Sequence, residues 1–374
     1  MKPKILICYG TRPEFIKLLP LYLELRRNSK FQILLCSTGQ HKDTLSDMYK
    51  LFNIYPDFEL NVSNKGTSIS ELVSNILIQF DLLLEEIKPN AVMVHGDTAT
   101  TFGSSLASFY RKIKVFHVEA GLRTNNIKEP FPEEMNRVLT GQICDLHFCP
   151  TKLAKTNLVK EGIDESLIHI TGNTIIDSVK IVKDMIKKDS GLKLITDKNK
   201  KLFKNEKILN ILFTVHRREN WGKNLDNFLS VISEVQEERN DLNITFLTHP
   251  NPIVKRMVES YRDKIKNFIV LQHQDYVNFI YLILKSDFIF SDSGGIQEEA
   301  IALGKDLYIL RDVTERPEVL VSKKIEIIGT SQEQIKEKLQ NLTFLSEQNQ
   351  DNYHPFGEGD ASVNIAKILD EYDI

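Results

Sequence analysis

Two carboxylates stand just after apolar runs of strand length in the first half of the chain. Asp97 follows the run at 91–95, and Glu119 follows the run at 115–118. In a parallel α/β sheet, ligands bind beyond the carboxyl ends of the strands, so we expect both side chains at a ligand-binding edge. Carboxylates that converge in a closed site can take a proton from a substrate and return it. Acid–base chemistry is therefore expected at this edge.

Two further positions could carry protons, and each has an alternative explanation. Glu133 and Glu134 begin a predicted helix, where acidic side chains are already favoured by the helix dipole. His216 follows the apolar run at 208–215, where a histidine can carry a proton near neutral pH. Its charged neighbours equally fit a loop held by ordinary salt bridges. Both alternatives stay open.

An anion-binding motif is expected in the second half of the chain. The apolar run at 288–290 leads into the small-residue turn 291–295, and a helical pattern begins at Ile296. Such a turn directs free backbone N–H groups and the positive end of a helix at one point, which suits a diphosphate. Glu299, one turn further on, can accept two hydrogen bonds from a ribose diol. The alternative is a tight turn whose glycines serve packing only.

Basic side chains after other strands could complete an anion site. Arg12 lies in the segment Gly-Thr-Arg-Pro-Glu after the first apolar run, and Lys17 would point the same way. A guanidinium group at such a turn suits a diphosphate, although a capping turn with a surface arginine is the alternative. Arg311 and Arg316 follow a late strand and could also meet an anion.

The elements that must position these groups alternate along nearly the whole chain. Apolar runs of strand length precede longer amphipathic segments, and the runs are apolar throughout, as expected for a parallel sheet covered on both faces. Repeated strand–helix units predict an α/β fold with doubly wound sheets. The predicted strands lie at 5–8, 31–37, 91–95, 115–118, 146–149, 167–171, 208–215, 244–248, 268–271, 288–290, 307–310 and 325–328.

A change in composition divides the chain into two halves. Residues between 187 and 207 are rich in lysine and poor in apolar side chains, which indicates an exposed junction. We expect Rossmann-like domains at 1–188, carrying the carboxylates, and at 208–358, binding the nucleotide, with a linker at 189–207. A C-terminal helix at 359–374 either stays with the second half or crosses back to the first. The two sheets would share an active-site cleft between them.

Bulk composition excludes several classes of protein. The chain has 374 residues, 41% apolar and 26% charged, which is enough for two cores. A net charge of −3 with interspersed lysines gives no nucleic-acid surface. The four cysteines and nine histidines lack metal-ligand spacing, so free thiols and no metal site are expected. No apolar run reaches the roughly 18 residues of a membrane span, and a strand near the N-terminus leaves no room for a signal peptide. We expect a cytoplasmic protein.

A series of short motifs in a fixed order carries a resemblance to a known family. The motifs are G-T-R-P-E at 10–14, H-G-D-T at 95–98, H-V-E-A-G-L-R-T at 117–124, P-E-E-M-N-R at 132–137, G-N-T at 172–174, H-R-R-E-N at 216–220, D-S-G-G-I-Q-E-E at 292–299 and T-E-R-P-E at 314–318. The set resembles the non-hydrolysing UDP-N-acetylglucosamine 2-epimerases over about residues 4–372. The resemblance implies the two-Rossmann architecture shared with GT-B glycosyltransferases, a homodimer, and a place in polysaccharide biosynthesis.

The resemblance also implies a reaction without a cofactor. UDP-N-acetylglucosamine and UDP-N-acetylmannosamine would interconvert through anti elimination of UDP, a 2-acetamidoglucal and re-addition of UDP. The catalytic groups would be Asp97, Glu119, Glu133 and His216. The groups that hold the UDP-sugar would be Arg12, Lys17, Arg137, Gln274, Phe279, Ser293, Gly294, Gly295, Glu299 and Arg316.

One departure from the family pattern concerns regulation. Many bacterial members bind a second UDP-N-acetylglucosamine as an activator, through a Q-H-R-x-M-L segment and an arginine on the following helix. Here that segment reads Gln-His-Lys-Asp-Thr-Leu at 40–45, and the arginine position matches Asn75. The matching positions are Gln40, His41, Arg217 and His249. We therefore expect weak or altered activation.

Three rival functions remain to be separated from epimerisation. A glycosyltransferase of the same fold would share the nucleotide-binding half but would not need three acidic residues opposite the diphosphate. A 2-epimerase of a modified UDP-sugar would tend to lose the H-V-E-A-G-L-R-T form, which this chain keeps. A nucleotide-sugar sensor without turnover would not need the full set of acids.

Overall fold

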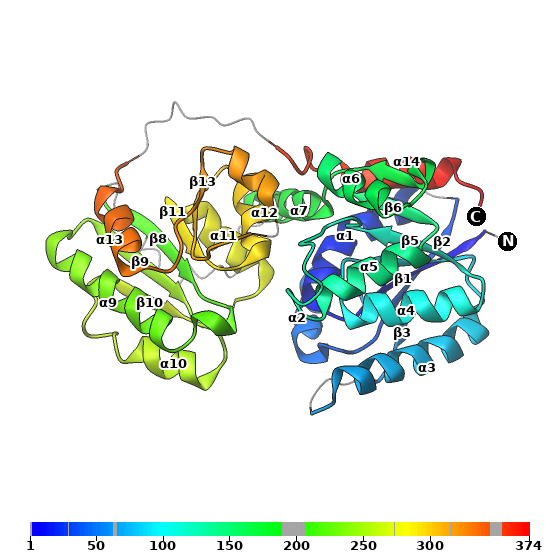
Figure 1. Cartoon of the computed structure of the whole chain (residues 1–374), viewed down its shortest axis with the longest axis horizontal. Coiled ribbons are helices and arrows are strands. Elements are labelled where there is room, and N and C mark those ends of the chain that lie inside the picture. Colours follow the sequence, from blue (N-terminus) through cyan, green and yellow to red (C-terminus); the bar gives the residue numbers. More distant parts are fainter. Residues whose placement is uncertain are drawn as a thin grey trace. The chain divides into compact units, whose positions relative to one another are not determined.

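The chain forms two compact units, which are shown in a computed structural model (Figure 1). The structure describes residues 2–28, 30–62, 66–188, 203, 207–272, 274–314, 316–344 and 354–374. Unit 1 comprises Met1–Ile181 with Pro355–Ile374, and unit 2 comprises Val182–His354. The predicted linker at 189–207 lies almost wholly outside the described residues. The predicted borders are 188 and 358; the two units divide at 181/182, inside the helix Thr174–Lys188, and at 354/355.

Unit 1 is built on a seven-stranded parallel sheet in the order β3-β2-β1-β4-β5-β6-β7. Its strands are β1 Lys4–Tyr9, β2 Gln32–Ser37, β3 Phe58–Glu59, β4 Ala91–His95, β5 Lys114–Val118, β6 Leu146–Cys149 and β7 Ile168–Ile170. The central strands are buried along nearly their whole length, as their continuous apolar sequences predict. Only the two-residue edge strand β3 lacks such a run and was not predicted.

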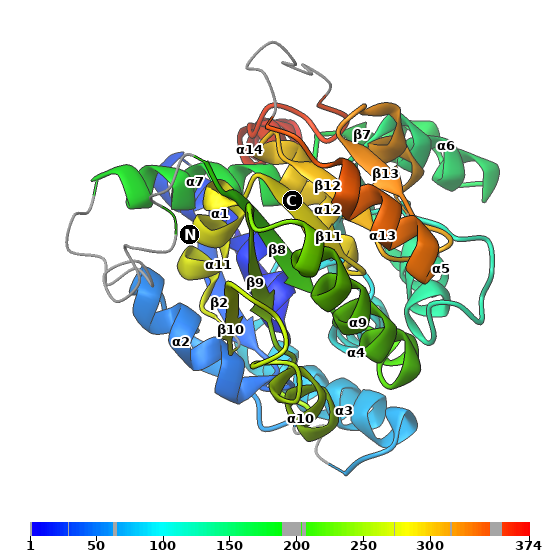
Figure 2. The same ribbon diagram turned by 90° about the vertical axis from the view of Figure 1, so that its left-hand side faces the viewer.

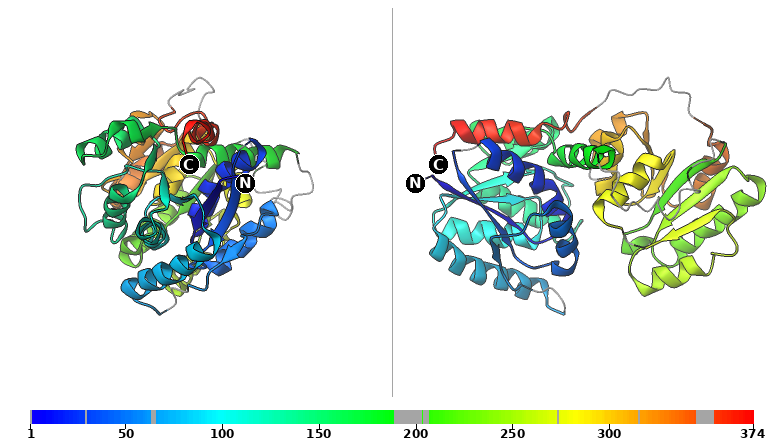
Figure 3. Two further views of the ribbon diagram at one scale, coloured as in Figure 1. Left: turned by 90° about the vertical axis from the view of Figure 1, so that its right-hand side faces the viewer. Right: turned by 180° about the vertical axis from the view of Figure 1, so that it is seen from behind.

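Helices cover this sheet, and one of them comes from the end of the chain. They are α1 Arg12–Asn28, α2 Lys42–Phe52, α3 Ile69–Ile87, α4 Ala99–Tyr110, α5 Glu133–Ile143, α6 Lys152–Lys160, the 3-10 turn η1 Glu165–Leu167, α7 Thr174–Lys188 and α14 Ala361–Glu371. Helix α14 packs beside α1, so the C-terminal helix crosses back to the first half (Figure 3). The 19-residue α3 was not among the helices predicted individually.

Unit 2 repeats the design with a six-stranded parallel sheet in the order β10-β9-β8-β11-β12-β13. Its strands are β8 Leu209–Thr214, β9 Leu242–Leu247, β10 Phe268–Leu271, β11 Phe288–Ser291, β12 Asp306–Ile309 and β13 Ile325–Ile327. Its helices are η2 Arg218–Asn220, α9 Lys223–Glu238, α10 Pro252–Glu259, α11 Tyr276–Lys285, α12 Gly294–Ala302, η3 Pro317–Val321 and α13 Gln332–Asn341. Helices α9 and α13 run side by side on this sheet (Figure 2).

The two sheet orders fix where a ligand site can form. In unit 1 the direction of winding reverses between β1 and β4, and in unit 2 it reverses between β8 and β11. A crevice opens beyond the carboxyl ends of strands at such a reversal. In each unit, the turns that leave these two strands therefore carry candidate site residues. Within the described residues, no helix is both long and apolar enough to cross a membrane.

Candidate active site

The buried carboxylate of Glu14 joins the turns that follow β1 and β4. Glu14 is 2% exposed, and it accepts hydrogen bonds from the backbone N–H of Thr11 at 2.8 Å and from the Thr98 hydroxyl at 2.7 Å. Burial raises the pKa of Glu14, and these hydrogen bonds oppose that shift. The Glu14 carboxylate thus connects the turn after β1, which contains Arg12, with the turn after β4, which contains Asp97.

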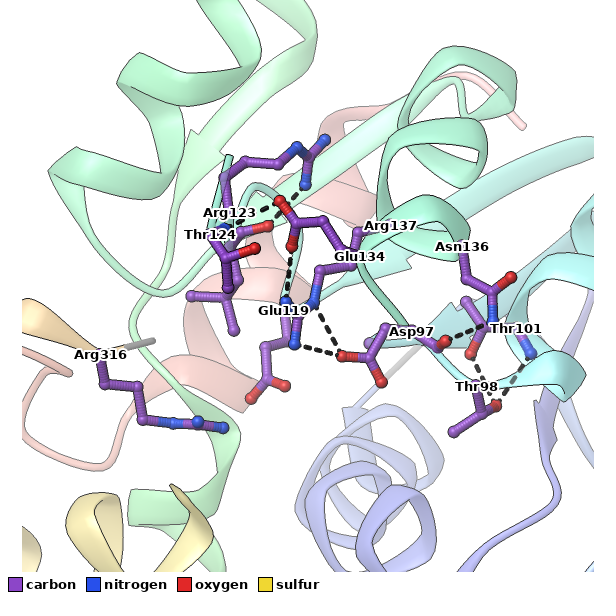
Figure 4. A network of polar contacts seen from close by, with 12 residues as sticks. Asp97, Thr98, Thr101, Glu119, Arg123, Thr124, Glu134, Asn136, Arg137 and Arg316 are labelled. Carbon is purple, nitrogen blue, oxygen red and sulfur yellow. Dashed lines mark hydrogen bonds and ion pairs between the residues drawn. The ribbon is translucent and has the colours of Figure 1, made fainter. Parts of the chain in front are cut away.

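Asp97 is held by an arginine from α5 (Figure 4). The Arg137 guanidinium donates to Asp97 Oδ2 from Nε at 2.8 Å and from Nη2 at 2.7 Å. The side-chain amide of Asn136 donates to the Asp97 backbone carbonyl at 2.9 Å. The Asp97 side chain is 23% exposed, whereas that of Arg137 is 8% exposed. The Asp97 carboxylate is therefore partly accessible and has a fixed orientation.

Glu134 stabilises the same arrangement from within the protein. It is 1% exposed, and its Oε1 accepts from the backbone N–H groups of Thr124 at 2.8 Å and Asn125 at 3.0 Å. Its Oε2 accepts from Arg137 at 2.9 Å, which completes a chain to Asp97 (Figure 4). Glu134 therefore serves the fold, which was the alternative to a catalytic role. Glu133 is half-buried and remains a predicted catalytic residue.

Glu119 follows β5 directly, and neighbouring side chains contact its carboxylate. Its carboxylate pairs with the Lys17 ammonium and accepts a hydrogen bond from the side-chain amide of Asn173 at 3.0 Å. His95 Nε2 lies 3.9 Å from the same oxygen. Glu119 has φ of +61°, a left-handed conformation that is uncommon for a non-glycine residue and is typical of functional sites. Lys17 is the side chain that the sequence predicts for a diphosphate, and here its ammonium group pairs with Glu119.

The rest of the segment around Glu119 serves the fold. His117 Nε2 donates to the backbone carbonyl of Gly96 at 2.8 Å, and burial lowers the pKa of His117 to about 3, so the ring is neutral. The Arg123 guanidinium donates to both carboxylate oxygens of Glu161, at 2.6 and 2.7 Å. These contacts fix the strand and the loop on both sides of Glu119.

In unit 2 a fully buried aspartate organises the turn that carries His216. Asp292, 0% exposed, accepts from the backbone N–H groups of His216 at 2.8 Å and Arg217 at 3.0 Å. The Asn220 amide also donates to it, at 2.9 Å. Burial lowers the pKa of His216, and the Asp292 carboxylate opposes the shift. Sequence reasoning missed this role, although the position of Asp292 directly after a buried strand was a usable signal.

The turn between β11 and α12 has the features of an anion site. Ser293 precedes the helix and makes no side-chain cap, and Gly294 and Gly295 form its first positions, two residues before the predicted start. A Cβ atom added at Gly295 would meet no atom within 4 Å. Packing therefore does not require a glycine there, which favours the ligand-binding explanation over the packing one.

The other predicted nucleotide-binding side chains of unit 2 come from α12, from the segment after β12, from the loop before α11 and from α11 itself. Glu299 is 6% exposed, and Arg316 is 8% exposed and donates from Nε to Glu298 at 2.6 Å. Arg316 is thus oriented by a buried carboxylate. Gln274 donates to a neighbouring backbone carbonyl at 2.6 Å, and Phe279 is half-buried in the first turn of α11.

The candidate regulatory residues lie in turns that leave the strands of each sheet. Gln40 Oε1 accepts from the Thr100 hydroxyl at 3.0 Å, and His41 is exposed. In unit 2 the ring centroids of His216 and His249 lie 6.0 Å apart, and Arg217 follows His216 in the chain. Over the part of the chain that the structure describes, no group of three His, Cys, Asp or Glu side chains could hold a metal ion, and the four cysteines are free and buried.

Comparison with known proteins agrees with this geometry. The family model described as UDP-N-acetylglucosamine 2-epimerase matches residues 23–370. The UDP-N-acetylglucosamine 2-epimerase of Escherichia coli strain K12 is 38% identical over 371 residues, which cover 98% of each chain. The structure is similar to that of the Neisseria meningitidis UDP-GlcNAc 2-epimerase bound to UDP-GlcNAc, with a TM-score of 0.87, 37% identity and coverage of 99% and 100% of the two chains.

A more distant solved structure has the same fold. The UDP-GlcNAc 2-epimerase from Methanocaldococcus jannaschii, in complex with UDP-GlcNAc and UDP, has a TM-score of 0.81 at 32% identity, covering 99% of this chain and 100% of the other. These matches confirm both the resemblance carried by the motifs and the predicted pair of Rossmann-like domains. With its strand-end carboxylates and its glycine turn in the expected places, the chain belongs to the UDP-N-acetylglucosamine 2-epimerase family.

Proposed function

We propose that the protein interconverts UDP-N-acetylglucosamine and UDP-N-acetylmannosamine. The observation that carries the proposal is the pair of oriented carboxylates in unit 1, Asp97 held by Arg137 and Glu119 held by Lys17 and Asn173. Acid–base inversion of a carbon that bears hydrogen removes a proton on one face and returns a proton on the other. Two carboxylates at one sheet edge supply groups for both steps. The family to which the chain belongs supports the same activity.

The proposed chemistry is elimination followed by re-addition. A base takes the proton from the carbon that bears the acetamido group, the bond between the anomeric carbon and the UDP oxygen breaks, and a 2-acetamidoglucal forms with UDP. UDP then adds back to the anomeric carbon while an acid delivers a proton to the opposite face. Asp97, Glu119 and Glu133 are the proposed acid–base and sugar-contacting groups. Since the carbon-bound proton is weakly acidic, stabilisation of departing UDP must supply much of the acceleration.

Unit 2 supplies the proposed UDP site. The N-terminus of α12, with open space above Gly295, is suited to a diphosphate, and Glu299 is suited to a ribose diol. His216, whose backbone is fixed by Asp292, is the proposed catalytic group near the diphosphate. Because burial lowers its pKa, a neutral imidazole that donates or accepts a hydrogen bond is its expected form.

A solvent-exchange experiment tests the proposed function. In deuterated water with UDP-N-acetylglucosamine and no acceptor, the protein should produce UDP-N-acetylmannosamine with deuterium at the acetamido-bearing carbon, measured by NMR and mass spectrometry. A glycosyltransferase would leave that carbon protonated without an acceptor, and a sensor would leave the sugar unchanged. Absence of both the exchange and the second sugar would refute epimerisation.

Regulation by a second substrate molecule is expected to be weak or altered. The lysine at position 42 and Asn75 stand where the family's activator site has arginines, although Gln40 and His41 match. Initial rates should therefore follow a nearly hyperbolic dependence on UDP-N-acetylglucosamine, and UDP-N-acetylmannosamine alone should be turned over. Strong sigmoidal kinetics, or inactivity toward UDP-N-acetylmannosamine alone, would contradict this expectation.

A further inference from the structure

A buried asparagine between β7 and α7 contacts the carboxylate of Glu119. Asn173 is 2% exposed, and its Nδ2 donates to Glu119 Oε2 at 3.0 Å. Its Oδ1 accepts from the backbone N–H of Ile175 at 3.1 Å, as an N-cap residue does. Its own backbone N–H donates to the carbonyl of Phe356 at 2.8 Å, on the returning C-terminal segment. Asn173 therefore joins β5, α7 and the end of the chain.

The orientation of this amide is determined by its surroundings. The N–H of Ile175 can only be met by the side-chain oxygen, so the NH₂ group must face Glu119, whose carboxylate oxygens can only accept. The backbone of this segment is equally constrained. Gly172 has φ of +89°, and a Cβ atom there would lie 2.9 Å from the Phe356 carbonyl oxygen. The donor thus approaches Glu119 from a fixed direction.

Glu119 needs such a fixed partner more than most carboxylates do. Its left-handed backbone persists only where neighbouring groups hold it. Lys17, from α1, also pairs with Oε2, but an ammonium on a four-carbon stem imposes little direction. His95, from β4, lies 3.9 Å from the same oxygen. Asn173 combines a hydrogen bond of 3.0 Å to this carboxylate with a side-chain oxygen that is held by the N–H of Ile175.

We propose that Asn173 is a positioning residue for Glu119, fixing the direction of its carboxylate and favouring its ionised form for proton transfer. This inference rests on the proposed function. Asn173 acts through Glu119, and its second task is to cap α7. The two tasks use different atoms of the amide, Nδ2 for Glu119 and Oδ1 for Ile175, so substitutions can separate them.

Two cap-preserving variants isolate the contact with Glu119. Asn173→Ser and Asn173→Asp both keep an oxygen that can cap α7, and both lose the NH₂ donor. Loss of this hydrogen bond to a charged group should lower kcat about 10- to 100-fold, with little change in KM. Since the donor favours the ionised carboxylate, the limb of the pH–rate profile that Glu119 sets should move to higher pH. The Asp variant should be affected more, because it adds a like charge.

A matched control disturbs α7 without contacting Glu119. Asp177, on the same helix, accepts from the backbone N–H groups of Ala361 at 3.3 Å and Ser362 at 2.9 Å. Asp177→Asn should lower the melting temperature and leave the pH–rate profile unchanged. Turnover across a range of pH, deuterium exchange and melting temperature are measured for the wild type and all three variants.

The outcomes separate this inference from the proposed function. A wild type that exchanges no deuterium refutes the function itself. An active wild type with an unchanged pH–rate profile in Asn173→Ser overturns only the positioning role. The role is also overturned if Asp177→Asn shows the same loss of kcat and the same shift, or if both Asn173 variants fail to fold. A lower kcat with a shifted limb, confined to the Asn173 variants, supports it.

Discussion

Asp97→Asn is expected to lower the rate of UDP-N-acetylglucosamine epimerisation at least about 100-fold, and Glu119→Gln is expected to do the same. Each change keeps the shape of the side chain and removes its ability to exchange a proton. Both carboxylates lie at the ends of neighbouring strands, and each is held by a basic side chain, Arg137 or Lys17. Turnover is measured by separating the two UDP-sugars, and deuterium exchange reports the proton-transfer step.

A matched carboxylate-to-amide change elsewhere in unit 1 serves as the control. Asp164 is exposed and caps the 3-10 turn η1 through the backbone N–H of Ser166 at 2.9 Å. Asp164→Asn should leave turnover within about twofold of the wild type, since surface substitutions usually have small effects. Near-normal rates in both Asp97→Asn and Glu119→Gln would remove these groups from the mechanism. A loss in only one variant would assign proton transfer to that residue together with Glu133, and would remove the other from the mechanism.

Asp292→Ala should have the largest effect on stability. The change leaves the backbone N–H groups of His216 and Arg217, and the amide of Asn220, without their buried acceptor. A buried donor left unsatisfied costs about 1–3 kcal/mol, and the N–H groups of His216 and Arg217 are partly buried, so the free energy of unfolding of unit 2 should fall by about 3 kcal/mol. Trp221, the single tryptophan of the chain, lies in unit 2 and reports its unfolding by fluorescence in urea.

An exposed aspartate of the same unit provides the comparison. Asp312→Ala should change the urea midpoint little, because this side chain is exposed. Turnover should also fall in Asp292→Ala, since the turn carrying His216 loses its anchor. If Asp292→Ala unfolded at the wild-type midpoint, the buried carboxylate would not be what holds this turn.

Much of the fold could be predicted from the sequence because most of its strands are continuous apolar runs. A strand buried on both faces needs an unbroken apolar run, and the runs at 91–95 and 288–290 coincide with β4 and β11 within one residue. Edge strand β3 has only two residues and no such run, so it carried no signal. The start of α12 was placed two residues late because glycines are poor helix formers, although at a first turn their cost is small.

The candidate site was predictable only in part. The apolar runs before Asp97 and Glu119 predict that both carboxylates follow strands, and the structure has them there, after β4 and β5. Their partners do not, because the contacts join residues far apart in the chain. Asp292 bonds the backbone 76 positions earlier, and Asn173 bonds Glu119 across 54 positions. The pair of Lys17 with Glu119 was not predicted, because helix periodicity gives the side of α1 on which Lys17 lies but not the carboxylate that its flexible stem reaches.

The return of the chain to unit 1 has a consequence for biosynthesis. Unit 1 is assembled from residues 1–181 and 355–374, with α14 packed on α1 and the Phe356 carbonyl bonded to Asn173. On the ribosome, the sequence of unit 2 emerges in full before the last segment of unit 1 does. The unit whose strands are made first is therefore completed last, and unit 2 can fold before unit 1 has its final helix.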